Sequence, residues 1–387
     1  MPDDRTDLLR RTLEGLLGAP ASDGNQIDVL RNGDEIFAAM LEAIGSATRT
    51  VDLLTFIYWT GEIGERFADA LSERARAGVR VRVLLDALGA HSIDTGLVDR
   101  MSDAGCDVRW FRPVTKGVLG EVNHRTHRKV LVCDEVVGFT GGVGIADEWM
   151  GDARNEDEWR DTHFRVLGPA VLGLRGAFID NWAETGADLF DPAVDRFPEL
   201  PRPGDRTVQV VKGAAETGWS DVATMFRALV LLAEERLRIT TAYFNPDELL
   251  LELICDASRR GVHVQVLLPG PHADKRFVQV ASESAYETLL EAGVEIHNFQ
   301  PSMLPAKVMT VDGLIAIVGL ANVNNRSTLF DEEVNLILYD RELTAILDAH
   351  FDDDLTRSEP IDPSRWADRS VVQKVAEKVV DTAKGMI

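Results

Sequence analysis

The stretch that decides the fold lies at residues 123–144 and reads NHRTHRKVLVCDEVVGFTGGVG. It contains His127, Lys129 and Asp134 in the spacing H-x-K-x4-D. Alternate residues of a strand share a face, so His127 and Lys129 point one way and the valines that follow point the other. An imidazole beside an ammonium suits an anionic substrate, because the ammonium neutralises phosphate oxygens while the imidazole attacks. Asp134 lies an odd number of residues after His127 and so belongs to the other face, and we expect it to brace the loop after the strand.

The sequence around this motif occurs a second time in the chain, so the motif is unlikely to be a chance match. RARAGVRVRVLLD at 74–86 matches ASRRGVHVQVLLP at 257–269, and DAGCDVRWFRP at 103–113 matches EAGVEIHNFQP at 291–301. HRKVLVCDEVVGFTGGVG at 127–144 matches PAKVMTVDGLIAIVGLAN at 305–322. This last match aligns Lys129 with Lys307, Asp134 with Asp312, and Gly141 with Gly319. Three matched blocks in the same order indicate an internal duplication.

The order of elements predicts an α/β protein with a largely parallel sheet covered on both faces, because apolar strands alternate with amphipathic helices. An N-terminal helix with Leu8, Leu9, Leu13, Leu16 and Leu17 on one stripe is expected to pack on the main body, and 19–25 reads as a loop. The predicted organisation is helix and loop over 1–25, first lobe over 26–190, Pro-rich linker over 191–205, second lobe over 206–358 and amphipathic tail over 359–387.

Composition narrows the class of protein. The 387 residues are 45% hydrophobic and 27% charged, which is typical of a globular chain with a sizeable core. The net charge of -23 argues against a broad nucleic-acid-binding face but not against a local anion pocket. Three cysteines without short spacing favour reduced, buried thiols in a cytoplasmic protein. We expect no signal peptide and no transmembrane helix, so any membrane contact would be peripheral.

The chain resembles the phospholipase D superfamily, whose mark is two H-x-K-x4-D-x6-G-[GS]-x-N segments, and within it the bacterial cardiolipin synthase-like branch. The resemblance extends over 26–358 and includes LRNGDEIFAAMLEAI, FTGGVGIADEW, WRDTHFRVLGPAV and NNRSTLFDEEVNLIL. It implies a duplicated fold in which each lobe has a mixed, mostly parallel sheet flanked by helices. The active site would lie at the pseudo-twofold interface between the lobes.

Roles carried over from the resemblance begin with His127 as the nucleophile that forms a phosphohistidine. Asp161 would orient His127 by accepting a proton from its other ring nitrogen, and Glu333 is the corresponding residue of the second half. Phosphate binding is assigned to Lys129, Lys307, Asn322, Gly141 and Gly142, and Asn322 could instead hold its own loop. Asp134 and Asp312 complete the candidate catalytic set. The resemblance implies no cofactor, and the sequence shows no spacing typical of a metal site.

The second copy departs from the family pattern. Pro305 stands where the second histidine belongs, Leu320 replaces the usual Ser, and Gly144 replaces the usual Asn of the first motif. In the family mechanism the second histidine protonates the leaving alcohol, and a positioned general acid is typically worth ~10²–10⁴-fold in rate. His124, His272 and His297 are candidate substitutes, while His163 reads as a satisfied polar contact.

These features predict a cytoplasmic enzyme, peripheral at the inner membrane face, that acts on phospholipids by phosphatidyl transfer or hydrolysis and is impaired by Pro305. A different class remains open, namely an inactive family member that binds phospholipid or phosphate. A nuclease is a third reading, which the acidic charge disfavours. The tail at 370–387 could lie on a membrane, although docking on its own protein or on a partner subunit fits its mixed charges better.

Overall fold

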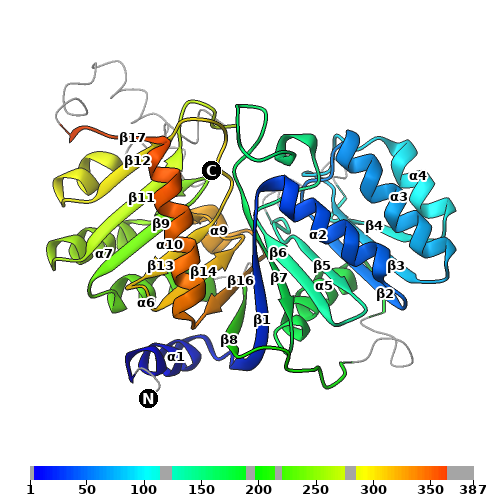
Figure 1. Ribbon diagram of the computed structural model, residues 1–387, viewed down its shortest axis with the longest axis horizontal. Helices are drawn as coiled ribbons and strands as arrows, with labels where there is room; N and C mark the ends of the chain where they lie inside the picture. Colours follow the sequence, from blue (N-terminus) through cyan, green and yellow to red (C-terminus); the bar gives the residue numbers. More distant parts are fainter. Residues whose placement is uncertain (1–3, 114–123, 189–196, 214–219, 275–284, 364–387) are drawn as a thin grey trace.

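The computed structural model describes residues 4–113, 124–188, 197–213, 220–274 and 285–363. Two α/β lobes lie side by side, with helices on both faces of the strands (Figure 1). The tail at 370–387 and part of the linker at 191–205 lie outside the described residues, whereas 197–205 contains no helix or strand.

The first lobe follows a short N-terminal helix, α1 (Asp4–Leu17). Its strands alternate with helices until the third parallel strand, after which a hairpin and one further strand complete the sheet. Its elements are β1 (Ala21–Arg31), α2 (Asn32–Ser46), β2 (Thr50–Thr55), α3 (Glu62–Arg76), β3 (Arg80–Asp86), α4 (Thr95–Asp103), β4 (Asp107–Phe111), β5 (Val130–Cys133), β6 (Val137–Gly141), the 3₁₀ turn η1 (Asp147–Trp149), β7 (Thr162–Leu167) and α5 (Val171–Glu184).

The second lobe repeats this order, as the duplication predicted. Its elements are β8 (Arg206–Gly213), α6 (Asp221–Leu232), β9 (Arg236–Thr240), β10 (Phe244–Asn245), α7 (Glu248–Arg259), β11 (His263–Pro269), β12 (Glu295–Phe299), β13 (Val308–Val311), β14 (Ile315–Gly319), β15 (Val323–Asn324), α9 (Asn325–Leu329), β16 (Glu333–Leu338), α10 (Arg341–Thr356) and β17 (Ser358–Pro360). The α/β class and the duplicated lobes are therefore confirmed.

Strand direction corrects one part of the fold prediction. Among the described residues, fifteen strands form one sheet in the order β17-β12-β11-β9-β13-β14-β16-β8-β1-β7-β6-β5-β2-β3-β4. Pairing is parallel for β2-β3-β4 and β9-β11-β12 but antiparallel through the centre. The expected mostly parallel sheet is wrong there, because β5 and β6 form a tight hairpin whose turn residues Asp134 and Glu135 both have positive φ.

Strand β1 joins the lobes and corrects the expected loop at 19–25. Its N-terminal part pairs with β8 and its C-terminal part with β7, so it lies at the centre of the molecule (Figure 1). A register shift between Ser22 and Asn25 accommodates the polar segment that resembled a loop. Asn25 satisfies the irregular backbone, since its side chain donates to Ser22 and Arg206 carbonyls and accepts from the Ala170 amide.

Apolar packing places the core on both faces of this sheet. In α1, Leu9, Leu13 and Leu17 are buried in the second-lobe core, whereas Leu8 and Leu16 are exposed, so the predicted packing of α1 on the main body is confirmed. A further cluster spans the lobes and includes Phe164 with Val334. None of the helices in the described ranges has the length and apolar character needed to cross a membrane.

Candidate active site

The two lobes meet through matching backbone contacts. The His127 amide of the first lobe donates to the Glu332 carbonyl of the second lobe (3.0 Å), and the Glu332 amide donates to the Arg125 carbonyl (2.9 Å). The pseudo-twofold counterpart of the second contact is the Arg160 amide donating to the Met303 carbonyl (2.9 Å). Proline has no backbone N–H, so position 305 cannot make the counterpart of the His127 amide contact.

The register of the strands identifies corresponding carboxylates. Gly141 of β6 pairs with His163 of β7, and Gly319 of β14 pairs with Asn335 of β16. Because Gly141 corresponds to Gly319, His163 corresponds to Asn335, and two residues earlier Asp161 corresponds to Glu333. The structure thereby supports the alignment of these two acids.

Glu333, not Asp161, is the partner of His127. The His127 Nδ1 lies 3.1 Å from each Glu333 carboxylate oxygen, and the Glu333 side chain is fully buried. Burial raises the pKa of Glu333 to about 7, although Lys129 and Lys307 oppose this rise. A carboxylate that accepts the Nδ1 proton leaves Nε2 as the nucleophilic nitrogen of the imidazole. The expected pairing of Asp161 with His127 is therefore wrong, because each carboxylate faces the motif of the opposite lobe.

Asp161 is bound by other groups. Its Oδ2 accepts a hydrogen bond from Trp149 Nε1 (2.8 Å), and its Oδ1 accepts one from the Thr162 amide (2.7 Å). Burial raises the pKa of Asp161, while the nearby charge of Lys307 opposes the rise. By the pseudo-twofold relation, Asp161 faces Pro305, so this carboxylate lacks the imidazole partner that Glu333 has.

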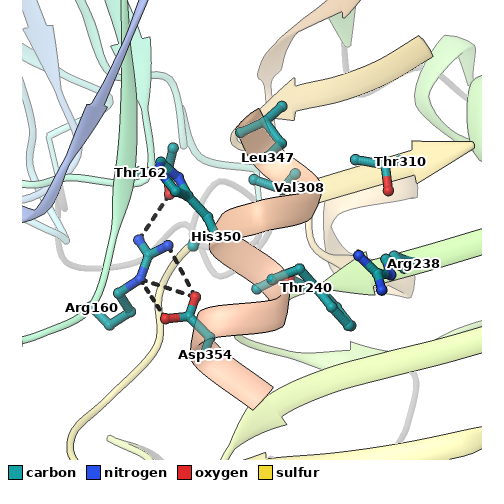
Figure 2. Close-up of a pocket in the computed structure, with 11 residues that line it drawn as sticks. Arg160, Thr162, Arg238, Thr240, Val308, Thr310, Leu347, His350 and Asp354 are labelled. Atoms are coloured by element: carbon teal, nitrogen blue, oxygen red, sulfur yellow. Dashed lines mark hydrogen bonds and ion pairs between the residues drawn. The ribbon is translucent and has the colours of Figure 1, made fainter. Parts of the chain in front are cut away.

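The neighbouring Arg160 turns away from this site and ties the lobes together. Figure 2 shows its guanidinium against Asp354 of α10, beside a cavity that His350 also lines. Arg160 Nε lies 3.0 Å from both Asp354 carboxylate oxygens, and both side chains are buried. This buried ion pair between lobes fixes the chain immediately before Asp161.

The two lysines face the site from opposite lobes in the same way. Lys129 Nζ donates to the His127 carbonyl (3.1 Å), and Lys307 Nζ donates to the Pro305 carbonyl. Burial, followed by the charge of Lys307, lowers the pKa of Lys129 to about 7. Burial also lowers the pKa of Lys307. Two buried ammonium groups that destabilise each other form a site that an anion such as phosphate would stabilise.

Gly141 and Gly142 permit close approach of β7. A Cβ atom at Gly141 would lie 2.7 Å from the Thr162 carbonyl oxygen, and one at Gly142 would lie 2.3 Å from Asp161 Oδ1. These glycines therefore let the Asp161 carboxylate approach the motif loop. Asn322 holds its own loop, because its Oδ1 accepts from the Tyr243 amide (3.3 Å) and lies 3.2 Å from Thr241 Oγ1.

Asp134 and Asp312 brace strands at the end remote from His127. Asp134 accepts hydrogen bonds from the Thr48, Arg49 and Thr50 amides at 2.7–2.9 Å. Asp312 accepts likewise from the amides of 234–236. The expected bracing role of Asp134 is confirmed, and Asp312 makes the same contacts, so both residues support strands instead of contacting the reacting groups.

We expect Asp134→Asn or Asp312→Asn to lower the free energy of unfolding by about 1–3 kcal/mol, since a carboxylate that accepts several amide hydrogen bonds is lost. Asparagine tolerates the left-handed backbone of both positions (φ 52° and 54°). Burial would raise the pKa of Asp134, but the Thr50, Thr48 and Arg49 amides lower it overall. Its contribution is present above the unfolded pKa and is lost as the pH falls through the folded pKa.

Urea denaturation midpoints of these variants measure the loss, and the Asp134→Asn deficit should shrink in acid. Asp99→Asn, at an exposed helical position, removes the same charge as a control. A deficit no larger than that of the control would contradict the bracing role.

The proposed substitutes for the missing histidine lie in other surroundings. His124 packs against Phe330, His272 pairs with Glu156 (3.2 Å), and His297 lies 3.7 Å from Glu295. Across the described ranges, no hydrogen bond or ion pair joins these three rings to Asp161 or Lys307. The structure therefore gives none of them the place of the second imidazole.

Near Lys129, sequence reasoning missed the ring of Phe56 and predicted the wrong surroundings for the imidazole of His163. The Phe56 ring lies edge-on to His127 (5.5 Å) and 5.6 Å from Lys129 Nζ. His163 is buried, and its Nδ1 has no hydrogen-bond partner within the described residues, so the expected satisfied contact is wrong. Burial and then Lys129 lower the pKa of His163 to about 3. Phe56 directly follows an apolar strand, so the sequence does not distinguish it from a residue of the hydrophobic core.

Comparison with known proteins adds an independent finding. The family model described as "Cardiolipin synthase, PLD-like domain" matches residues 40–157 and 227–355. The chain is 35% identical over 364 residues to a cardiolipin synthase of Geobacillus sp. (strain WCH70), covering 93% of this chain and 72% of that protein. It is 32% identical to cardiolipin synthase 1 of Bacillus anthracis, covering 97% and 75%. The crystal structure of a phosphatidylserine synthase of Haemophilus influenzae shares the fold, with a TM-score of 0.71 at 16% identity, covering 98% and 100%.

Proposed function

Because the chain belongs to the phospholipase D-like family of the cardiolipin synthases, we propose that it is a phosphatidyltransferase that acts on phospholipids through a phosphohistidine at His127. The observation that carries this proposal is the contact of His127 Nδ1 with buried Glu333 in a site that two lysines share. The acceptor would be an alcohol such as the glycerol headgroup of phosphatidylglycerol, with water as the alternative.

The first step follows from the geometry of the first-lobe motif. His127 Nε2 attacks phosphorus while Glu333 holds Nδ1 and stabilises the positive charge that develops on the ring. Lys129 and Lys307 neutralise the phosphate oxygens from the two lobes, which is electrostatic stabilisation by preorganised groups. The alcohol oxygen leaves with the electron pair of its bond to phosphorus.

Among the described residues, the site lacks an evident proton donor for that leaving oxygen. Pro305 carries no proton donor, and Asp161 is enclosed by Trp149 and the Thr162 amide. We infer that turnover is slow because water must supply the proton. The same observation favours a second candidate, a family member that binds phospholipid without turnover.

A lipid substrate implies contact with a bilayer surface, which we place at the cytoplasmic face. Leu88 and Leu329 are exposed, and each lies two residues from an acid beside the site, Asp86 and Asp331 respectively. The charge of Asp86 acts on Asp331, so the two segments that carry these leucines approach each other from the two lobes. Exposed leucines on both segments would support peripheral binding despite the acidic net charge.

Incubation with vesicles of phosphatidylglycerol labelled with ³²P should transfer label to His127. Acid-labile, base-stable label on the peptide that contains His127, together with labelled lipid product, would support the enzyme. If the protein binds vesicles but gives neither label nor product with any phospholipid, the second candidate, a family member that binds phospholipid without turnover, is supported. Absence of binding and of turnover would contradict both.

A further inference from the structure

A tyrosine–aspartate pair lies on the second-lobe side of the site. Tyr243 Oη donates to Asp274, at 2.9 Å from Oδ1 and 2.7 Å from Oδ2. Tyr243 is half-buried, whereas Asp274 is exposed. The phenol therefore fixes the direction of a carboxylate that still reaches solvent, with lone pairs left for a ligand.

Two contacts connect this pair to the lysine and to the second motif. The Tyr243 amide donates to Asn322 Oδ1 (3.3 Å), so the motif positions the tyrosine backbone. Burial lowers the pKa of Lys307, and the negative charge of Asp274 is among those that oppose this effect. Asp274 therefore acts on the group proposed to bind the phosphate.

The first lobe lacks this arrangement. Thr55 Oγ1 donates to the Ile57 carbonyl just as Thr241 Oγ1 donates to the Tyr243 carbonyl, so Ile57 corresponds to Tyr243. The counterpart of Asn322 is Gly144, where a Cβ would lie 2.8 Å from Ile57 Cβ. This position is thus apolar in the first lobe and polar in the second.

In an in-line displacement, the difference between the two lobes determines which residues lie near the alcohol. When His127 attacks phosphorus from the first lobe, the alcohol departs on the opposite side, and the acceptor later attacks the phosphohistidine from that side. The opposite side belongs to the second lobe, where Lys307 and Tyr243 lie. The leaving and entering alcohols therefore approach the second-lobe side of the site, on which Tyr243 and Asp274 lie.

We propose that Tyr243 and Asp274 form the alcohol subsite and select headgroups with a second hydrogen-bond donor, such as a free hydroxyl of glycerol; this rests on the proposed function. The acceptor oxygen bonds to phosphorus as the phosphorus–nitrogen bond to His127 breaks. The electron pair returns to the imidazole, and the hydroxyl proton passes to water. Asp274 accepts a hydrogen bond from the second donor of the alcohol and repels an alcohol that carries a carboxylate of its own.

Competition between acceptors tests the proposal without depending on the overall rate. Deuterated glycerol and 1-propanol are supplied together with phosphatidylglycerol vesicles, and mass spectrometry measures the ratio of the two transfer products. We expect the unmodified protein to favour glycerol about tenfold, as one charge-assisted hydrogen bond allows. Asp274→Ala should bring the ratio close to one, and Tyr243→Phe should lower it less. Replacing glycerol with ethanolamine shows whether the second hydrogen-bond donor must be a hydroxyl or can be another donor, such as an ammonium group.

Asp99→Ala is the matched control, because this acid is exposed on α4. An unchanged product ratio in Asp274→Ala, with His127 still labelled, would overturn the subsite and leave the proposed function intact. Failure of the unmodified protein to form phosphohistidine or product would overturn both.

Discussion

Replacing His127 with glutamine is expected to lower turnover of phospholipid by at least about 10⁴-fold, because the covalent intermediate cannot form. Glutamine retains a donor toward Glu333, whose oxygens lie 3.1 Å from Nδ1, so the buried carboxylate keeps a partner. The variant should therefore fold. Radioactive lipid assays measure the rate, and intact-protein mass spectrometry should show no phosphatidyl adduct.

Two companion variants make this result specific. Glu333→Gln keeps the nucleophile but weakens its orientation, and we expect a loss of about 10²–10⁴-fold. His124→Gln removes an imidazole three residues earlier, one that packs against Phe330, and should leave turnover within about twofold. Retention of turnover by His127→Gln would exclude His127 as the nucleophile.

Replacing Pro305 with histidine is expected to raise turnover by about 10²–10⁴-fold, the usual effect of a positioned general acid. The pseudo-twofold relation places the new ring toward Asp161, as His127 faces Glu333. Burial already raises the pKa of Asp161, and an imidazole partner would stabilise its charged form. Leu320 should be left in place, because it is fully buried in the core shared by the lobes.

Pro305→Ala is the control for the backbone, since it restores an amide without supplying an acid. A p-nitrophenyl phosphodiester adds a chemical control, because p-nitrophenolate leaves without protonation. Pro305→His should accelerate natural lipid far more than this activated ester. Equal rates in the histidine, alanine and unmodified proteins would show that another group already donates the proton.

The duplication and the α/β class were predictable because they depend on local patterns. Apolar strands alternate with amphipathic helices, and three matched blocks repeat in order, so the evidence lies within short windows. Asp134 was also predictable as a bracing residue, since its parity separates it from His127. Direction of pairing was not predictable, because hydrogen bonding between distant strands is absent from any one window.

Polar composition misled the prediction for 19–25. Asp23, Gly24 and Asn25 have the character of a loop, yet the segment belongs to β1 and pairs with β8. The side chain of Asn25 satisfies backbone groups of the irregular strand, which replaces regular pairing there. Long-range pairing thus outweighed local propensity.

Sequence alone determined that each half carries a motif lysine, that the first half keeps its imidazole and that the second has Pro305. It determined these features because residue identity and spacing are local. Only the tertiary structure decided which carboxylate meets which motif. Glu333 reaches His127 because the lobes exchange partners across their interface, and the same exchange leaves Asp161 facing a proline.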